Sequence, residues 1–60
     1  MSEANALTLN TALHLVPSEA RLAVALGVRL EDLQRWLRNE ANPPPQVILA
    51  ALDIIRRGHR

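Results

Sequence analysis

A single glycine, Gly27, separates two short stretches in which apolar residues recur at the spacing of a helix. Glycine tolerates a positive φ, so the chain can turn sharply at this position. Ser18 suits the N-cap of a first helix over Glu19–Leu26, and Ala23 is small where the two helices would cross most closely. The residues that we expect to be buried by this pair are Leu22, Ala23, Leu26, Val28, Leu33, Trp36 and Leu37. The segment therefore predicts two packed helices joined by a tight turn.

The second helix of this pair has signals at both of its ends. We expect it to begin at Arg29 or Leu30, because Glu31 and Asp32 then fall in the first turn, where negative charge suits the positive end of the helix dipole. Asn39 is suited to a left-handed residue that ends a helix. The helix is therefore predicted to extend over residues 30–38.

The chain before Ser18 predicts a further short helix. Apolar residues at helical spacing favour a helix near Leu7–Leu15, which Pro17 cannot continue. Met1–Ala6 is polar and small, and we expect it to be a disordered, frayed terminus. The residues that mark the apolar face are Leu9, Ala12, Leu13 and Val16.

A last helix is predicted after the proline-rich loop Glu40–Pro45. Pro44 or Pro45 can open it, since proline suits the first helical turn, and Gly58 ends it. Residues 57–60 form a basic tail. The apolar stripe that we expect to face the core is Val47, Ile48, Ala51, Leu52 and Ile55. Without any strand-like alternation, the chain predicts one all-α domain over residues 1–60, a small bundle of four to five short helices.

Length and composition exclude several classes of protein. The chain has 60 residues, a formal net charge of +1 and no cysteine, so disulfides and thiolate metal sites are excluded. Its apolar stretches are far shorter than the roughly 20 residues of a membrane span, and the first residues lack the basic start of a signal peptide. We therefore expect a cytoplasmic protein without a membrane partner.

The predicted helix pair has the spacing of a helix-turn-helix, whose second helix enters the major groove of DNA. The run LAVALGV, followed by Leu33, Trp36, a short polar loop and Pro43, resembles the lambda repressor/Cro-like helix-turn-helix family of bacteria and phages. The resemblance extends over about Leu7 to Ile55. It implies a small DNA-binding protein, a transcriptional regulator that places helix 30–38 in the major groove of double-stranded DNA as a homodimer.

The resemblance implies two groups of residues in the helix pair, one that contacts bases and one that contacts phosphates. Arg29, Gln34 and Arg35 would read base edges, Leu30 could touch a thymine methyl, and Glu31 could accept from a cytosine amine. Phosphate contacts would come from Ser18, Arg21, Arg38 and Asn39.

Three acidic residues favour an alternative. Many members of the family carry a glutamine at the position of Glu19, where it supports a phosphate contact, and a glutamate there would repel phosphate. Glu31 and Asp32 reduce electrostatic affinity for a polyanion. Together with the small net charge and with Leu30, they favour a helix-turn-helix used as a protein-interaction module that does not bind DNA.

Individual residues also have two interpretations. Arg35 either reads a base or forms an i,i+4 pair with Glu31 on a solvated face. Leu30 either packs back on the preceding helix or contacts a protein partner. The basic residues that either follow a DNA backbone or balance the helix dipole are Arg56, Arg57 and Arg60.

Nothing in the sequence predicts an enzyme, a cofactor or a metal site. Trp36, the single aromatic residue, has the phase of a core residue rather than of a base-stacking platform. His14 and His59 lack partners at metal-ligand spacing. The chain also lacks a nucleophile with its base and a glycine-rich phosphate loop.

Overall fold

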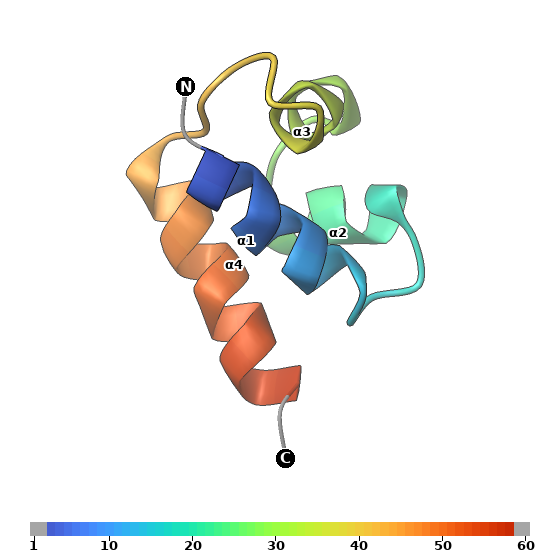
Figure 1. The fold of residues 1–60 in the computed structure, drawn as a ribbon. Coiled ribbons are helices and arrows are strands. Elements are labelled where there is room, and N and C mark those ends of the chain that lie inside the picture. The colour runs from blue at the N-terminus through green and yellow to red at the C-terminus, as the bar shows by residue number, and fades with distance from the viewer. Residues whose placement is uncertain (1–2, 59–60) are drawn as a thin grey trace.

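Four helices make up the part of the chain that the computed structural model describes, residues 3–58. They are α1 (Glu3–Leu13), α2 (Glu19–Leu26), α3 (Leu30–Leu37) and α4 (Pro45–Gly58), and no strand occurs in these residues (Figure 1). The predicted all-α small bundle is confirmed. The bounds of α2 and the starts of α3 and α4 also agree with the sequence signals.

Helix α1 is the centre of the packing. It contacts α2, α3 and α4, whereas α3 and α4 do not contact each other within the described residues (Figure 1). Every helix contributes two residues to the buried core, which is Leu9, Ala12, Leu22, Ala23, Leu33, Trp36, Val47 and Ala51. Burial of each large apolar side chain stabilises the fold by about 1.5–3 kcal/mol. Helices α3 and α4 therefore both pack on α1 and on α2, and their buried side chains belong to one core.

The first helix lies earlier in the chain than the sequence predicts. It begins at Glu3 rather than near Leu7, so Glu3–Ala6, expected to be frayed, is helical. Alanine is the best helix former, and the side chains of Thr8 and Asn10 donate to backbone oxygens one turn earlier. The helix ends at Leu13 because the chain then tightens into i→i+3 hydrogen bonds before Pro17. Met1 and Ser2 lie outside the described residues.

The apolar stripe of α4 is only partly as predicted. Val47 and Ala51 are buried, and Ile48 and Ile55 pack against the core, but Leu52 is 48% exposed. The buried line is centred on Val47 and Ala51, and Leu52 lies beyond its edge on the helix. The prediction that Leu52 faces the core is therefore wrong.

Two predicted features of the chain ends have different outcomes. Gly58 is the last residue of α4, as expected, and its Cα lies close to the α1–α2 connection. A Cβ at this position would come within 2.8 Å of the side chain of Leu15. Of the predicted basic tail, Arg57 and Gly58 belong to α4, and His59 and Arg60 lie outside the described residues.

Because α1 carries the packing, a cavity in its buried face should be costly. We expect Leu9→Ala to lower the free energy of unfolding by about 2–5 kcal/mol. A domain of this size has only a few kcal/mol of stability, so the variant should be largely unfolded at room temperature. Circular dichroism during urea titration measures the effect. Leu7→Ala, on the same helix but 67% exposed, is the matched control and should change stability by less than about 0.5 kcal/mol. Equal effects of the two variants would contradict this packing.

Candidate nucleic-acid interface

The turn between α2 and α3 is built around Gly27, which has a φ of 72°. Its N–H bonds the oxygen of Val24 at 3.1 Å, and the N–H of Val28 bonds the oxygen of Ala23 at 3.0 Å. This pair of bonds satisfies carbonyls that the end of α2 would otherwise leave free. Only a left-handed residue closes the turn in this way, so the predicted role of Gly27 is confirmed.

The first turn of α2 is capped as predicted. Ser18 has extended backbone angles, and its Oγ accepts a hydrogen bond from the N–H of Arg21 at 3.2 Å. The side chains of both residues are exposed. They therefore lie at the surface at the positive end of the α2 dipole, where an anion is favoured.

Helix α3 begins without a side-chain cap. Arg29 stands at the N-cap position with φ −76° and ψ 144°, and its side chain makes no cap hydrogen bond. Its guanidinium instead lies 3.6 Å from the Glu31 carboxylate, Nη2 to Oε2. Since both side chains are mostly exposed, this pair adds little stability.

The far end of α3 is closed by Asn39, which has a φ of 61°. Its N–H bonds the oxygen of Trp36 at 3.1 Å, and the N–H of Glu40 bonds the oxygen of Arg35 at 2.9 Å. The same left-handed geometry thus ends both α2 and α3. The predicted left-handed conformation of Asn39 is confirmed.

Two sides of α3 have opposite character. Leu33 and Trp36 are buried, and Leu30 and Leu37 pack against the core. Trp36 is therefore a core residue, as predicted, and Leu30 packs inward rather than standing free in solvent. On the other side the exposed side chains are Glu31, Arg35 and Arg38. These three positions follow one another at helical spacing, so they form a polar ridge along the open side of α3.

A hydrogen bond that the sequence did not predict joins the two helices. Nε2 of Gln34 donates to Oε1 of Glu19 at 3.2 Å, although fifteen positions separate them. Glu19 therefore places a negative charge near the start of α2 and also holds the side chain of Gln34, a candidate for reading bases. No local spacing rule connects residues this far apart, and only the crossing of α2 and α3 brings them together.

One of the two interpretations of Arg35 was an ion pair with Glu31. Within residues 3–58 that pair is absent, and Glu31 pairs with Arg29 instead. The guanidinium of Arg35 thus remains on the open side of α3. Acids and arginines are nevertheless balanced on this part of the surface, where Glu19, Glu31, Asp32 and Glu40 accompany Arg21, Arg29, Arg35 and Arg38.

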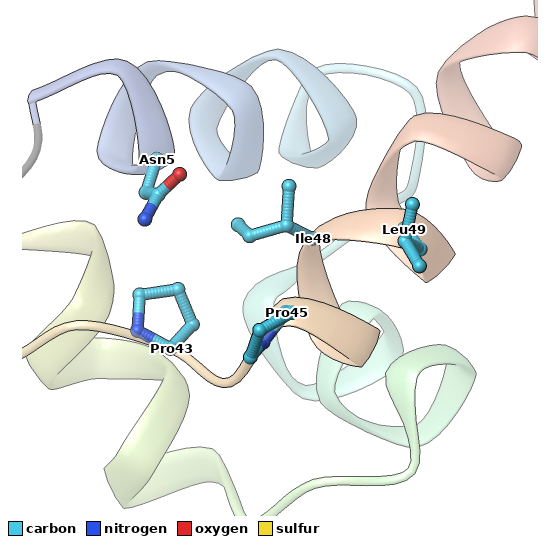
Figure 2. A pocket seen from close by; sticks show the side chains of 5 residues that line it. All are labelled: Asn5, Pro43, Pro45, Ile48 and Leu49. Carbon is cyan, nitrogen blue, oxygen red and sulfur yellow. The ribbon is translucent and has the colours of Figure 1, made fainter.

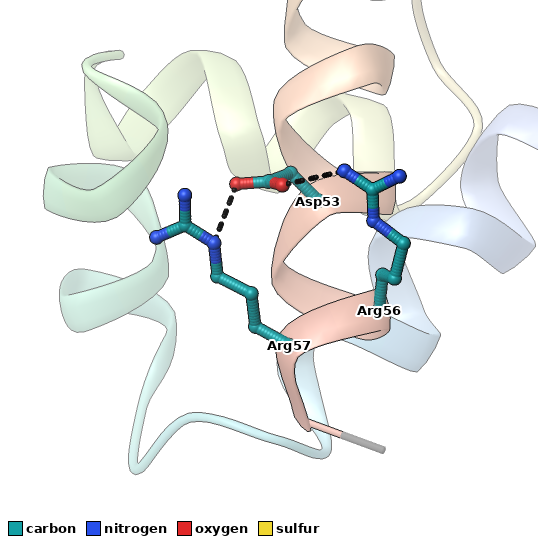
Figure 3. Close-up of polar contacts among 3 residues, drawn as sticks. All are labelled: Asp53, Arg56 and Arg57. Atoms are coloured by element: carbon teal, nitrogen blue, oxygen red, sulfur yellow. Dashed lines mark hydrogen bonds and ion pairs between the residues drawn. The ribbon is translucent and has the colours of Figure 1, made fainter. Parts of the chain in front are cut away.

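The basic residues of α4 belong to a different surface. Asp53 accepts from Nη2 of Arg56 at 3.2 Å and from Nε of Arg57 at 3.1 Å (Figure 3). The i,i+3 and i,i+4 spacings were a signal for these pairs that the sequence interpretation missed. Helix α4 contacts α2 but not α3 in the described part of the chain, so these arginines do not lie beside the exposed side chains of α3.

A hollow of about 360 Å³ lies between the start of α1 and the start of α4 (Figure 2). Its lining is Asn5, Pro43, Pro45, Ile48 and Leu49, almost wholly apolar and without a titratable group.

Residues 3–58 contain no group of three histidine, cysteine or acidic side chains that could hold a metal ion. None of the helices in the same residues has the length and apolar character that a membrane span requires.

Comparisons of the chain with protein-family models, with curated proteins and with solved structures found no match.

The ionisation of Glu31 can be measured directly. A hydrogen bond from its own backbone N–H, followed by the charge of Arg29, lowers the pKa of Glu31 below the ordinary value of 4.5. The carboxyl carbon should therefore titrate below pH 4.5 in an NMR experiment, and Arg29→Gln should raise the midpoint without fully restoring 4.5. Since folding lowers this pKa, the stability that ionised Glu31 adds is present above about pH 4.5 and is lost as the pH falls through the folded value. A midpoint at or above 4.5 would contradict the geometry at the start of α3.

Proposed function

We propose that this chain is a small sequence-specific DNA-binding protein, a transcriptional regulator that places α3 in the major groove and binds as a homodimer. The observation that carries the proposal is the orientation of α3. Leu33 and Trp36 anchor one side of the helix in the core, while Arg35 and Arg38 stand on the open side. A short helix held in this way and presenting long polar side chains has the form that enters a major groove.

The polar side chains have chemistry that suits distinct parts of DNA. Arg35 carries a guanidinium without an ion pair to Glu31, and such a group can bond the two acceptors of a guanine edge. Gln34 donates one N–H to Glu19, which leaves its Oε1 and its second N–H for an adenine edge. Glu31 could accept from a cytosine amine. On this proposal, three neighbouring positions of α3 read three different base edges.

Phosphate contacts are proposed for the two ends of the interface. Ser18 and Arg21 lie at the N-terminus of α2, where the helix dipole favours anions. Arg38 and Asn39 lie at the end of α3, beyond the base-reading positions. Such contacts fix the position of the helix on the duplex and make binding depend strongly on salt.

The balance of charge supports a second candidate, a protein-interaction module that does not bind DNA. Acids equal arginines in number over the helix-turn-helix surface, and the carboxylate of Glu31 is stabilised in its charged form. Salt dependence discriminates the two candidates. A DNA-binding protein should lose affinity for random duplex with a logarithmic slope of about −0.9 for each phosphate contact, and an interaction module should not bind the duplex at any salt concentration.

The base-reading assignment is tested with Arg35→Ala. Against duplexes selected from a random pool, we expect this variant to lose about 5- to 150-fold in affinity, the range of 1–3 kcal/mol for one bidentate contact. Fluorescence anisotropy measures the loss. Arg57→Ala removes an exposed arginine side chain from α4, outside the proposed DNA contacts, and should bind as the unmodified protein does. Equal losses for both variants would contradict the assignment of α3.

The acidic residues supply an independent test. The double variant Glu31→Gln and Asp32→Asn should bind random duplex more tightly at low salt, because two negative charges are removed from the start of α3. If the double variant does not bind more tightly than the native chain, α3 does not face the DNA.

A further inference from the structure

Helix α4 carries a second apolar line on the side opposite its buried one. Leu49 is 67% exposed and Leu52 is 48% exposed. Together with Pro45 and Arg56 they are spaced four, three and four residues apart along the helix, and we call this line the outer seam. This spacing is the one that faces a partner in paired helices. Two exposed leucines one turn apart form an apolar patch that a partner surface can cover.

The surface beside the outer seam is uneven in a way that fits a copy of itself. The hollow between α1 and α4 adjoins Pro45 and Leu49, and Figure 2 shows Ile48 on its inner wall. A second, smaller hollow is lined by Leu49, Leu52, Asp53 and Arg56. Protruding leucines and adjacent hollows therefore alternate along one helix, and the protrusions of one copy can enter the hollows of another.

The charges bordering the seam are also self-complementary. Asp53 borders the outer seam and pairs within one copy with Arg56 of the seam and with Arg57 (Figure 3). If a second α4 packs antiparallel with the two-fold axis beside Leu52, its Arg56 stem lies along Leu49 and its guanidinium comes within reach of Asp53. Two-fold symmetry repeats this contact. A surface bearing only one sign of charge would instead repel its own copy.

We propose that the outer face of α4 is the homodimer interface, occupied by a second copy of this chain with the two α4 helices antiparallel across an axis beside Leu52. The area available is modest. A standard interface covers about 800 Å² of each partner, roughly a fifth of the 4131 Å² that this chain exposes. One helix face of 14 residues covers less than that, so the dimer is weak and forms as concentration rises.

The position of this interface suits the proposed function, on which this one step rests. Because α3 does not contact α4 in the described residues, pairing through α4 leaves both α3 helices uncovered.

Sedimentation equilibrium without DNA tests the interface. The native chain should pass from the 6.7 kDa monomer toward twice that mass as concentration rises into the millimolar range, and Leu49→Glu should remain monomeric. The matched control is Leu7→Glu, the same residue type with the same 67% exposure but on α1, which should dimerise as the native chain does. Circular dichroism verifies that all three are folded. A native chain that stays monomeric, or a Leu7→Glu variant that loses the dimer as Leu49→Glu does, would overturn the proposal.

Cross-linking provides a second measurement that does not depend on the stability of a charged variant. Because the chain has no cysteine, Leu52→Cys introduces a single thiol beside the proposed axis. A short bis-maleimide should link two copies of this variant efficiently, and should link Leu7→Cys at least tenfold less. Equal yields would place the contact elsewhere. A dimer that cross-links through Leu52→Cys but does not bind any duplex would refute DNA binding and leave the interface established.

Discussion

The burial of Leu33 and Trp36 is the interaction on which the remaining features of the molecule depend. These two side chains fix the rotation of α3 about its axis, and so determine that Arg35 and Arg38 face solvent. The left-handed turn at Gly27 sets where α3 begins relative to α2. A change in either would rotate the polar ridge, and every proposed contact with DNA would move with it.

Charge balance gives the surface of the helix pair its particular character. Most of the affinity of proteins for DNA begins with positive charge, and here acids offset the arginines. The hydrogen bond from Gln34 to Glu19 shows that one of these acids holds a neighbouring polar side chain in place. In the proposed function, recognition then depends more on directed contacts with bases than on general attraction to phosphate. A weak dimer through α4 would supply further affinity, because two copies would bind one site together.

The features of the fold that the sequence predicts correctly are those set by a few neighbouring residues, such as helix caps and turns. The cap at Ser18, the left-handed residues Gly27 and Asn39, and the start of α4 at Pro45 each depend on a few neighbouring residues, and each is confirmed. Features that depend on how helices cross were missed. The exposure of Leu52 follows from which side of α4 faces α1, and the Glu19–Gln34 bond follows from the angle between α2 and α3. The spacing of residues along the sequence specifies neither the side of α4 that faces α1 nor the angle at which α2 crosses α3.

An NMR titration of the labelled protein with a mixed-sequence DNA duplex at low salt tests the central claim most directly. We expect chemical-shift changes concentrated in residues 29–38 and at the start of α2 around Ser18, with the exposed α1 residues Leu7 and Thr11 little affected. A protein that stays folded and shows no shifts, or shifts confined to α4, would contradict it. The helix-turn-helix would then be a surface for a protein partner.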